Sequence, residues 1–434
     1  MGKIIEETML VMVDTKNNNN KFYHVTLDDA NVVTKRWGRV GAEGASSVET
    51  TGKIGYERAI KSKEKKGYKV SPIVSTGVTV KSSVNHLDEV AKKFLSKDSG
   101  DTLISNLIDR LVASNQHQIM EQSGGMIKIT DDGTVKTALG VVDLCSINSA
   151  RDLIGEMQKK KTGQTKLLED YLTLIPQNIG YRRGWEEDFL KTENFAKQMD
   201  FLKQLEDSVQ WRNTTAQVTT DDEDKFDIDA HKDLFRMNLA KISDSGKDFD
   251  RINKMFKETR NNMHTSRNLK LVNVYAVEDV KGKEAYEAAQ KKYGNVRELW
   301  HGTKASNVLS ILTKGLFVPN AGSGIPVTGR MFGDGVYFSD QSTKSLNYAN
   351  GYWDGSRTSQ NCFMLLNDVV MGHEYRPQRW DYNSLRQAHK GVGTSGKPYQ
   401  SISVRGGTCN VRNNEMIIWN TDQVAVRYLC EFGS

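Results

Sequence analysis

The sequence predicts a multidomain α+β protein built from three consecutive parts. Strand-like alternation at the N-terminus, amphipathic helical segments in the middle, and short strands between turn signals in the C-terminal half lead to this prediction. At roughly 100–200 residues per domain, 434 residues fit about two to four domains. Hydrophobic residues make up 37% and charged residues 26% of the chain, which indicates packed cores.

The first part, residues 1–75, is predicted to be a small β-rich module with one helix. LVMVDT at 10–15 and KFYHVTLD at 21–28 alternate as strands do, and NNNN at 17–20 predicts the turn between them. GYERAIKSKEKKGY at 55–68 predicts the helix. With 13 Lys and Arg against 9 Asp and Glu, this part is expected to carry most of the net charge of +6.

The second part, residues 84–215, is predicted to be an all-α bundle, after a linker at 71–83. Each of its five segments places apolar residues three and four positions apart. TTDDEDKFDID at 219–229 is typical of a solvated acidic linker. The helical segments are EVAKKFLSK, TLISNLIDRLVASN, SARDLIGEMQKKK, TKLLEDYLTLIP and NFAKQMDFLKQLEDSV.

The third part, residues 222–434, is predicted to be a mixed, mainly β domain with few helices. It lacks the regular strand–helix alternation of a parallel α/β sheet. Turn residues separate the strand candidates NLKLVNVYAVE, RELWHGTK, GDGVYFSD, CFMLLNDVVMG, EMIIWN and QVAVRYLCEF.

Several classes of protein are excluded by composition. The four cysteines lie far apart with no CxxC pair, so we expect free thiols, a reducing compartment and no structural metal. No apolar run approaches the ~18 residues that span a membrane, so no membrane partner is expected. The charged N-terminus MGKIIEETML does not resemble a signal peptide.

A glycine-rich stretch, GRMFGDGVYFSDQSTKSLNY at 329–348, raises the question of a phosphate-binding loop. A dinucleotide-binding loop needs GxGxxG between a strand and a helix, whereas GRMFGDG leads into a strand. The preceding GSGIPVTG at 322–329 has the wrong spacing, and no GxxxxGK exists. The glycines alone therefore predict an ordinary hairpin before a buried strand.

The neighbouring residues favour a different kind of nucleotide site. Tyr337 and Tyr348 are close enough in sequence to hold an aromatic ring between them, and Ser345 could bind an amide. His301 in LWHGTK and Glu415 in VRNNEMIIW each have an ordinary structural interpretation, as a strand-end histidine and a polar strand edge. Together the five residues could hold a nicotinamide ring, its carboxamide and its ribose.

LWHGTK, PVTGRMFGDGVYFSDQSTKSLNY and NNEMIIW resemble the catalytic domain of poly(ADP-ribose) polymerases. His301, Tyr337 and Glu415 match the family's catalytic histidine, tyrosine and glutamate. KRWGRVG resembles the WGR module of the DNA-dependent members, YLTLIPQNIG a signature of their helical regulatory domain, and HKGVGTSGKP a loop before the glutamate strand. The resemblance thus implies a WGR DNA-binding domain at 1–75, a helical regulatory domain at 84–215 and an ADP-ribosyltransferase domain at 222–434, without zinc fingers.

The resemblance implies that NAD+ is a substrate, with no cofactor and no metal. Gly302 and Ser345 would bind the carboxamide, Tyr337 and Tyr348 would sandwich the ring, and His301 would hold the ribose. Glu415 would stabilise the oxocarbenium-like transition state and polarise an acceptor hydroxyl. The implied NAD-binding set is His301, Gly302, Thr303, Tyr337, Lys344, Ser345 and Tyr348.

The resemblance also implies DNA strand breaks as a partner and a role in the DNA damage response and repair. Lys35, Arg36, Trp37 and Arg39 are the implied DNA-binding residues, although a Trp-Gly-Arg turn could also be only a packed aromatic in a sheet. The helical domain would block the NAD+ site until DNA binds, so the protein should be nearly inactive without a DNA end. Deletion of 84–215 should then give constitutive activity.

Two positions depart from the family pattern, and three questions stay open. Phe317 stands where an adenosine-side arginine is usual, and Arg330 where an aromatic residue usually faces the acceptor. Acceptor proteins are expected to include the enzyme itself, and polymer synthesis is favoured over the alternative of single ADP-ribose transfer. A DNA-end-binding scaffold with an inactive transferase domain is the other alternative. Localisation would be nuclear in a eukaryotic host and cytoplasmic in a bacterial or viral one.

Overall fold

A computed structural model of the chain divides into two compact units, each described by itself. The first contains residues 1–87 and 116–227, and the second contains residues 88–115 and 228–434 apart from 325–328. The linker at 72–83, much of the acidic run, the GSGIPVTG loop and Arg330 lie outside the described residues. The structure describes residues 2–14, 19–40, 44–71, 84–97, 101–137, 140–160, 162–179, 184–217, 226–318, 331–353, 355–393 and 396–434.

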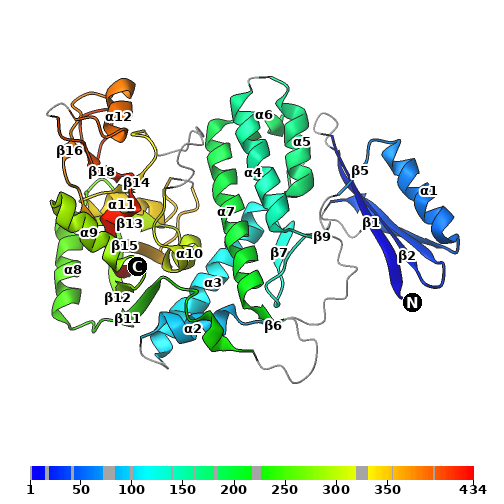
Figure 1. The fold of residues 1–434 in the computed structure, drawn as a ribbon, viewed down its shortest axis with the longest axis horizontal. Coiled ribbons are helices and arrows are strands. Elements are labelled where there is room, and N and C mark those ends of the chain that lie inside the picture. The colour runs from blue at the N-terminus through cyan, green and yellow to red at the C-terminus, as the bar shows by residue number, and fades with distance from the viewer. Residues whose placement is uncertain are drawn as a thin grey trace. The chain divides into compact units, whose positions relative to one another are not determined.

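The N-terminal module of the first unit is a five-stranded antiparallel sheet with one helix, as predicted (Figure 1). The strands follow the order β4-β3-β2-β1-β5, and α1 packs on one face. Tyr23, Val25 and Tyr56 lie in the core between that face and the helix. The elements are β1 (Ile4–Asp14), β2 (Asn19–Asp28), β3 (Val33–Arg39), β4 (Ala45–Glu49), α1 (Gly52–Glu64) and β5 (Lys69–Val70).

The rest of the first unit is a helical bundle with a small added sheet. Buried side chains such as Ile154, Leu168 and Leu202 form its core. The helices are α4 (Leu144–Lys159), α5 (Gln164–Leu174), α6 (Trp185–Phe189), α7 (Thr192–Thr215) and the latter part of α3 (Thr102–Gln122). The short strands are β6 (Val84–Asn85), which pairs with β10 (Ala216–Gln217), and the sheet of β7 (Ile127–Ile129), β8 (Val135–Thr137) and β9 (Gly140–Val141).

The prediction of helices alone was therefore incomplete for this region. Asp131, Asp132 and Gly133 join β7 to β8, and Gly133 has a φ of 74°. An Asp-Gly pair between short β-branched runs is a strong hairpin signal, because glycine adopts the positive φ of the turn without strain. The sequence therefore contains a signal for this hairpin, between two longer helical patterns.

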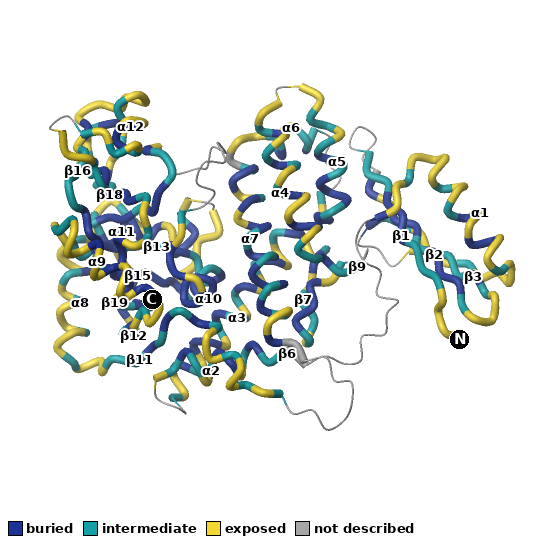
Figure 2. Tube along the Cα trace, viewed as in Figure 1, coloured by how far each residue is buried: buried dark blue, intermediate teal, exposed yellow. Residues whose placement is uncertain are grey.

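The second unit contains two sheets, and all six predicted strands are confirmed. The larger sheet has the order β11-β12-β19-β15-β13, and the smaller has the order β14-β18-β17-β16. β15 is buried along nearly its whole length, so residues that point to either face of the sheet are covered (Figure 2). The strands are β11 (Met237–Lys241), β12 (Lys270–Asp279), β13 (Val296–Thr303), β14 (Val336–Phe338), β15 (Cys362–Val370), β16 (Glu374–Tyr375), β17 (Ser401–Val404), β18 (Glu415–Ile418) and β19 (Val424–Gly433).

Five helices accompany these sheets, more than the sequence pattern indicated. Most are short and interrupted by polar residues, which weakens their apolar periodicity. They are α8 (Lys247–Glu258), α9 (Lys283–Tyr293), α10 (Ala305–Lys314), α11 (Ser342–Ala349) and α12 (Tyr382–His389). Across the described part of the chain, no helix combines the length and apolar character needed to cross a membrane.

The second unit also includes most of α2 (Leu87–Leu95) and the first part of α3. An Arg110 guanidinium nitrogen donates to the buried Glu431 carboxylate at 3.1 Å, and Asn273 Nδ2 donates to the same carboxylate at 2.9 Å. Burial would raise the pKa of Glu431, but these hydrogen bonds hold it below its ordinary value. The ion pair anchors α3 on β19, so the beginning of the helical region packs with the larger sheet.

Candidate active site

Gly302 on β13 is required by the packing of α11. A Cβ at this position would lie 1.7 Å from the backbone oxygen of Ser345, so no side chain fits between the strand and the helix. The Ser345 hydroxyl donates to the backbone oxygen of Trp300 at 3.1 Å. The glycine therefore lets α11 lie directly against the edge strand of the larger sheet.

The edge of β13 also presents free backbone groups. Trp300 exchanges two backbone hydrogen bonds with Ser339, at 2.9 and 3.0 Å. Because backbone groups two residues apart face the same side of an antiparallel strand, the N–H and C=O of Gly302 point to this same side, away from β15. Outside the strand ladder, no backbone partner is recorded for Gly302 among the described residues. One donor and one acceptor are thus available side by side, as an amide ligand would require.

His301, on the same strand, is half-buried and held in one orientation. Its Nδ1 lies 2.9 Å from the backbone oxygen of Tyr337, and since a carbonyl only accepts, Nδ1 carries the proton. Burial lowers the pKa of His301, and the positive charge of Lys344 lowers it further. A neutral ring protonated on Nδ1 leaves Nε2 as an acceptor, which suits a ribose hydroxyl.

The two tyrosines come from different elements. Tyr337, on β14, donates its hydroxyl to the Gly333 backbone oxygen at 2.8 Å and accepts from the Phe332 N–H at 3.0 Å. Tyr348, on α11, is 40% exposed and lies near the Lys344 ammonium. Burial and the negative charge of Glu415 raise the pKa of Tyr348 to about 12, so the phenol stays neutral.

Glu415 and Lys344 form the central ion pair of the site. Lys344 Nζ lies 2.6 Å from a Glu415 carboxylate oxygen, and the side chains are 5% and 14% exposed. Burial raises the pKa of Glu415, and the charge of Lys344 works against that rise. Lys344, which was predicted to bind NAD+, pairs its ammonium with this carboxylate. Lysine is almost never fully buried without a partner, which accounts for the pairing.

Supporting residues that the sequence interpretation missed hold the first residues of β18 in place. Ser339 Oγ donates to the Asn414 backbone oxygen at 2.9 Å, and the Asn414 amide donates to Asp340 at 3.0 Å. The Asn414 N–H in turn donates to Gln341 Oε1 at 3.2 Å. These bonds fix the residue just before Glu415, which explains why an asparagine precedes the carboxylate.

The remaining candidates lie at the margins of the site. Thr303 ends β13 and is buried opposite Phe363. Phe317, in the loop after α10, is 38% exposed. The structure thus brings the backbone of Gly302, the His301 ring, the Tyr337 backbone, Ser345, Lys344 and Glu415 together through β13, β14, α11 and β18.

The four DNA-binding candidates lie on β3 of the first unit. Lys35, Trp37 and Arg39 occupy alternate positions and therefore share one face of the strand. Trp37 is 36% exposed, and Lys35 forms an ion pair of 2.6 Å with Glu49. Arg36 lies on the opposite face, which strand alternation could have predicted. The four do not form one continuous patch.

The face of Trp37 gains a further cation from α1. Trp37 pairs with Tyr23 on β2, and their ring centroids are 6.2 Å apart. Lys63 Nζ lies 4.3 Å from the centroid of the Tyr23 ring. On the other face, the Arg36 guanidinium covers Phe22 at 5.2 Å. An exposed indole among lysines and arginine is a surface suited to stacking and phosphate contact.

Comparison with known proteins assigns a domain in each unit. Residues 246–433 match the poly(ADP-ribose) polymerase catalytic domain, and residues 6–73 match the WGR domain. Residues 246–433 are thus the catalytic domain of an NAD+ ADP-ribosyltransferase. The chain is 24% identical to poly(ADP-ribose) polymerase 2 of Zea mays and 25% identical to that of Homo sapiens. These matches cover 99% of the chain and 70% and 79% of the two relatives.

The Drosophila melanogaster poly(ADP-ribose) polymerase is 26% identical, over 84% of this chain and 37% of its own length. The chain thus carries the catalytic domain of poly(ADP-ribose) polymerases together with a WGR domain, and it is homologous to these enzymes over nearly its full length.

Proposed function

We propose that this protein is a DNA-break-activated enzyme that transfers ADP-ribose from NAD+ to proteins, including itself, and extends it into a polymer. The Lys344–Glu415 pair near His301 carries the proposal, because it provides a largely buried carboxylate that can stabilise positive charge on a bound ribose. NAD+ is consumed as a substrate, and the reaction needs no further cofactor.

NAD+ would bind along β13 and α11. The free N–H and C=O of Gly302 and the hydroxyl of Ser345 would hold the carboxamide, which fixes the ring plane. Tyr337 and Tyr348 would cover its two faces, since offset aromatic contacts favour such a sandwich. Nε2 of His301 would accept from a ribose hydroxyl.

In the chemical step, the bond between the ribose carbon and the nicotinamide nitrogen breaks. Nicotinamide leaves with the electron pair as a neutral ring, and the ribose develops an oxocarbenium-like charge. The Glu415 carboxylate stabilises that charge more in the transition state than in the ground state. The acceptor oxygen then bonds to the ribose carbon, and its proton passes to Glu415 and on to water.

The polymer and single-transfer alternatives differ in product length. The automodified protein should run as a smear on a gel for a polymerase and as one sharp band for a single transfer. The test is incubation with labelled NAD+ and nicked duplex DNA, followed by electrophoresis. A sharp band at every NAD+ concentration would establish single transfer instead.

We expect DNA-end activation to depend on Trp37. Trp37→Ala should raise the DNA concentration for half-maximal stimulation by roughly 5- to 150-fold, because stacking on one base contributes about 1–3 kcal/mol. NAD+ consumption is measured against increasing amounts of nicked duplex. Val48→Ala, at a side chain 65% exposed on the neighbouring β4, is the control and should respond as the wild type does. Equal rates with and without DNA in the wild type would contradict DNA activation.

The helical bundle of the first unit is the proposed inhibitory element. Leu202→Ala empties a fully buried position and should destabilise the bundle by about 2–5 kcal/mol. NAD+ consumption without DNA should then rise by roughly 5- to 150-fold, the range of a coupling free energy of about 1–3 kcal/mol. Met120→Ala, at a 41% exposed position, is the control. A destabilised Leu202→Ala variant with unchanged basal activity would contradict inhibition by the bundle.

Localisation would follow the DNA on which the enzyme acts. In a eukaryotic host we propose the nucleus and a role in the repair of broken chromosomes, and in a bacterial or viral setting the cytoplasm. The similarity to plant and animal poly(ADP-ribose) polymerases supports the former. Tagged protein recruited to induced DNA breaks within living cells would test this.

A further inference from the structure

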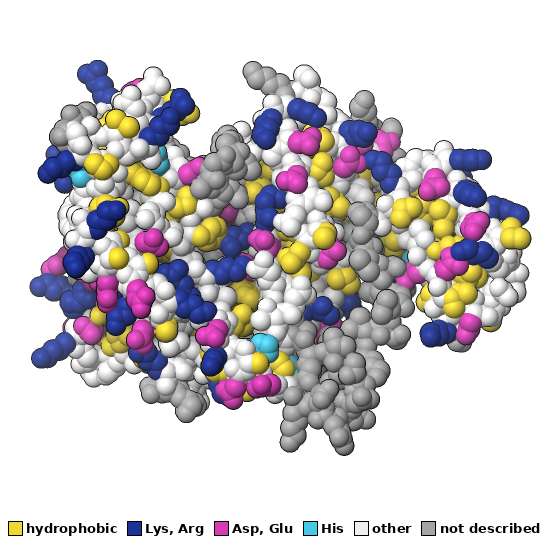
Figure 3. All heavy atoms as spheres, viewed as in Figure 1, with side chains coloured by type: hydrophobic (Ala, Val, Ile, Leu, Met, Phe, Trp, Pro, Cys, Tyr) yellow, Lys and Arg dark blue, Asp and Glu magenta, His cyan; other side chains and the backbone are white. Residues whose placement is uncertain are grey.

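A second concentration of positive charge lies in the catalytic domain. Residues 371–414, here called the basic segment, carry seven Lys and Arg against two Asp and Glu, a surplus of five. This exceeds the surplus of four in residues 1–75, so positive charge is not concentrated in the first part alone. Figure 3 shows Lys and Arg side chains over the α12 and β16 region.

Most cations of the basic segment have no acidic partner. The Glu374 carboxylate accepts from Arg376 and Asn295, and the Asp381 carboxylate caps the N-terminus of α12 through the Ser384 N–H. Both acids are therefore occupied by structural contacts. Among the described residues, no carboxylate pairs with the other six cations, which are Arg379, Arg386, Lys390, Lys397, Arg405 and Arg412.

A hollow of about 470 Å³ opens beside these cations. Arg297, Arg376, Arg405 and Asp340 line it. Arg297 contacts Asp340 and Arg376 contacts Glu374, so Arg405 is the lining guanidinium that has no carboxylate partner among the described residues. Guanidinium groups bind phosphate oxygens through paired N–H donors, so Arg405 is available to a pyrophosphate-bearing ligand.

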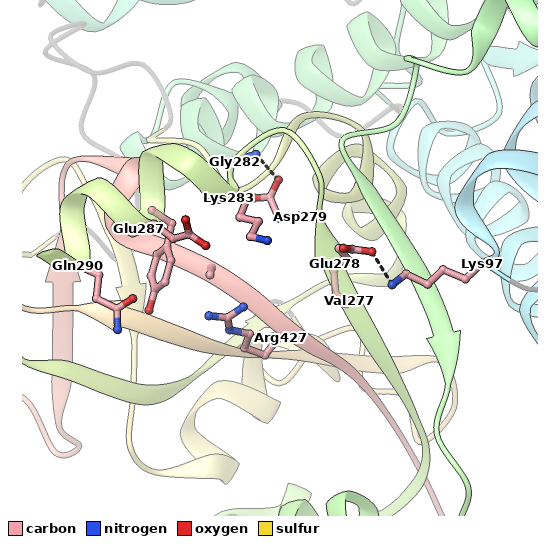
Figure 4. A pocket seen from close by; sticks show the side chains of 11 residues that line it. Lys97, Val277, Glu278, Asp279, Gly282, Lys283, Glu287, Gln290 and Arg427 are labelled. Carbon is pink, nitrogen blue, oxygen red and sulfur yellow. Dashed lines mark hydrogen bonds and ion pairs between the residues drawn. The ribbon is translucent and has the colours of Figure 1, made fainter.

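A second hollow of the same domain has equal numbers of positive and negative side chains. It opens between β12, α9 and β19, and Figure 4 shows its side chains. Its three cations stand beside three carboxylates, and Lys97 pairs with Glu278. We assign no ligand to this hollow, because its charges already neutralise one another.

The basic segment is connected to the catalytic residues at three places. Trp380 Nε1 donates to the Met331 backbone oxygen at 3.0 Å, and His389 Nε2 contacts the Phe332 backbone oxygen at 2.5 Å. Both contacts hold the loop that leads to Tyr337. Arg405 and Arg412 lie in the connection between β17 and β18, and β18 begins with Glu415.

The hollow lies across the small sheet from Glu415. Asn414 and Met416 line it, and successive residues of a strand face opposite sides, so the Glu415 carboxylate is on the other face. β18 begins at Glu415, so the carboxylate and the hollow lie on opposite faces of the sheet at the same end of this strand. A polymer leaving Glu415 would pass this strand end on the way to Arg405.

We propose that the basic segment binds the ADP-ribose polymer as it leaves the active site. The proposal rests on the proposed function, since only a polymerase produces this ligand. Each unit carries a pyrophosphate for the arginines and an adenine for the aromatic side chains of Trp380 and Tyr382, which are 46% and 64% exposed. Continuity with the catalytic loop favours the product over duplex DNA as the ligand.

Binding of a purified, fluorescent ADP-ribose oligomer to the full chain without NAD+ tests the proposal by anisotropy. Arg405→Gln/Arg412→Gln, at two exposed and unpaired positions, should weaken binding at least tenfold at low salt. The slope of log affinity against log salt should become less steep by about 0.7 per lost phosphate contact. Lys291→Gln/Lys292→Gln removes the same charge from exposed positions of α9 and should bind as the wild type does.

Three outcomes would overturn the proposal. The Arg405/Arg412 variant could bind as the wild type does, both double variants could lose affinity equally, or duplex DNA of equal charge could compete equally and show the same dependence on the arginines. If the Arg405/Arg412 variant has a lowered melting temperature, it is replaced by Arg386→Gln/Lys390→Gln, at the C-terminal end of α12, and this second variant must then weaken binding. Because the oligomer is supplied ready-made, failure to synthesise polymer would disprove the proposed function without affecting this test.

A second measurement relates binding to synthesis. With NAD+ and DNA, the Arg405/Arg412 variant should make shorter polymers at an unchanged initial rate of nicotinamide release. Equal polymer lengths in the variant and the wild type would contradict a role in elongation.

Discussion

Glu415→Gln is expected to lower the rate of ADP-ribose transfer by about 100- to 1000-fold. This is the loss measured when one preorganised electrostatic contact to a transition state is removed. The amide keeps the size of the side chain but carries no negative charge for the oxocarbenium-like ribose. Nicotinamide release under saturating NAD+ and DNA measures kcat. Because the lost contact acts mainly on the transition state, KM should change much less than kcat.

Glu415→Gln should also destabilise the protein, and the controls must separate this loss of stability from the loss of transfer activity. Lys344 remains buried opposite a neutral amide, and an unpaired buried charge costs about 3–5 kcal/mol. We therefore expect a lower melting temperature for Glu415→Gln, and its recovery in Glu415→Gln/Lys344→Met. Activity should stay lost in the double variant, because stability returns without the carboxylate. Glu298→Gln, elsewhere in the same domain, is a control for loss of a carboxylate. Near-normal transfer by Glu415→Gln would contradict the proposed mechanism.

The fold of the catalytic domain was largely predictable because its strands alternate or run continuously apolar between turn residues. β13 and β15 follow this pattern, and both were found in the sequence. Helices such as α11 were missed because Ser342, Thr343 and Ser345 interrupt its apolar stripe, yet the fold buries all three hydroxyl residues. Burial of polar residues is decided by tertiary contacts, which no local pattern reports.

The candidate site was predictable by residue type and only partly by contact. His301, Tyr337 and Glu415 stood out because their sequence context was distinctive. The pairing of Lys344 with Glu415 joins residues 71 positions apart, and nothing in either segment specifies the partner. The basic segment escaped notice for a related reason: its cations are spread over 44 residues and form no run.

Lys344→Met is expected to move the acid limb of the pH–activity profile to higher pH. The reaction needs Glu415 ionised, and burial already raises its pKa. The Lys344 charge opposes that rise, so its removal raises the pKa of Glu415 further. Activity near neutral pH should therefore fall, while alkaline buffer restores much of it.

Recovery at alkaline pH distinguishes this effect from simple damage to the site. Lys344 also lowers the pKa of His301, so its removal favours protonation of that ring under acid conditions and adds to the same shift. Both groups return to their active forms as the pH rises. Tyr348, whose pKa is about 12, stays neutral throughout the useful range.

The measurement is kcat for nicotinamide release from about pH 5.5 to 9, with saturating DNA. Lys344→Arg keeps the cation and should leave the acid limb close to that of the wild type. Lys254→Met removes an exposed charge of α8 and should leave it unchanged. If Lys344→Met lost activity equally at every pH, the lysine would hold the architecture of the site without tuning its carboxylate. A shift confined to Lys344→Met would instead assign the lysine to the ionisation of Glu415.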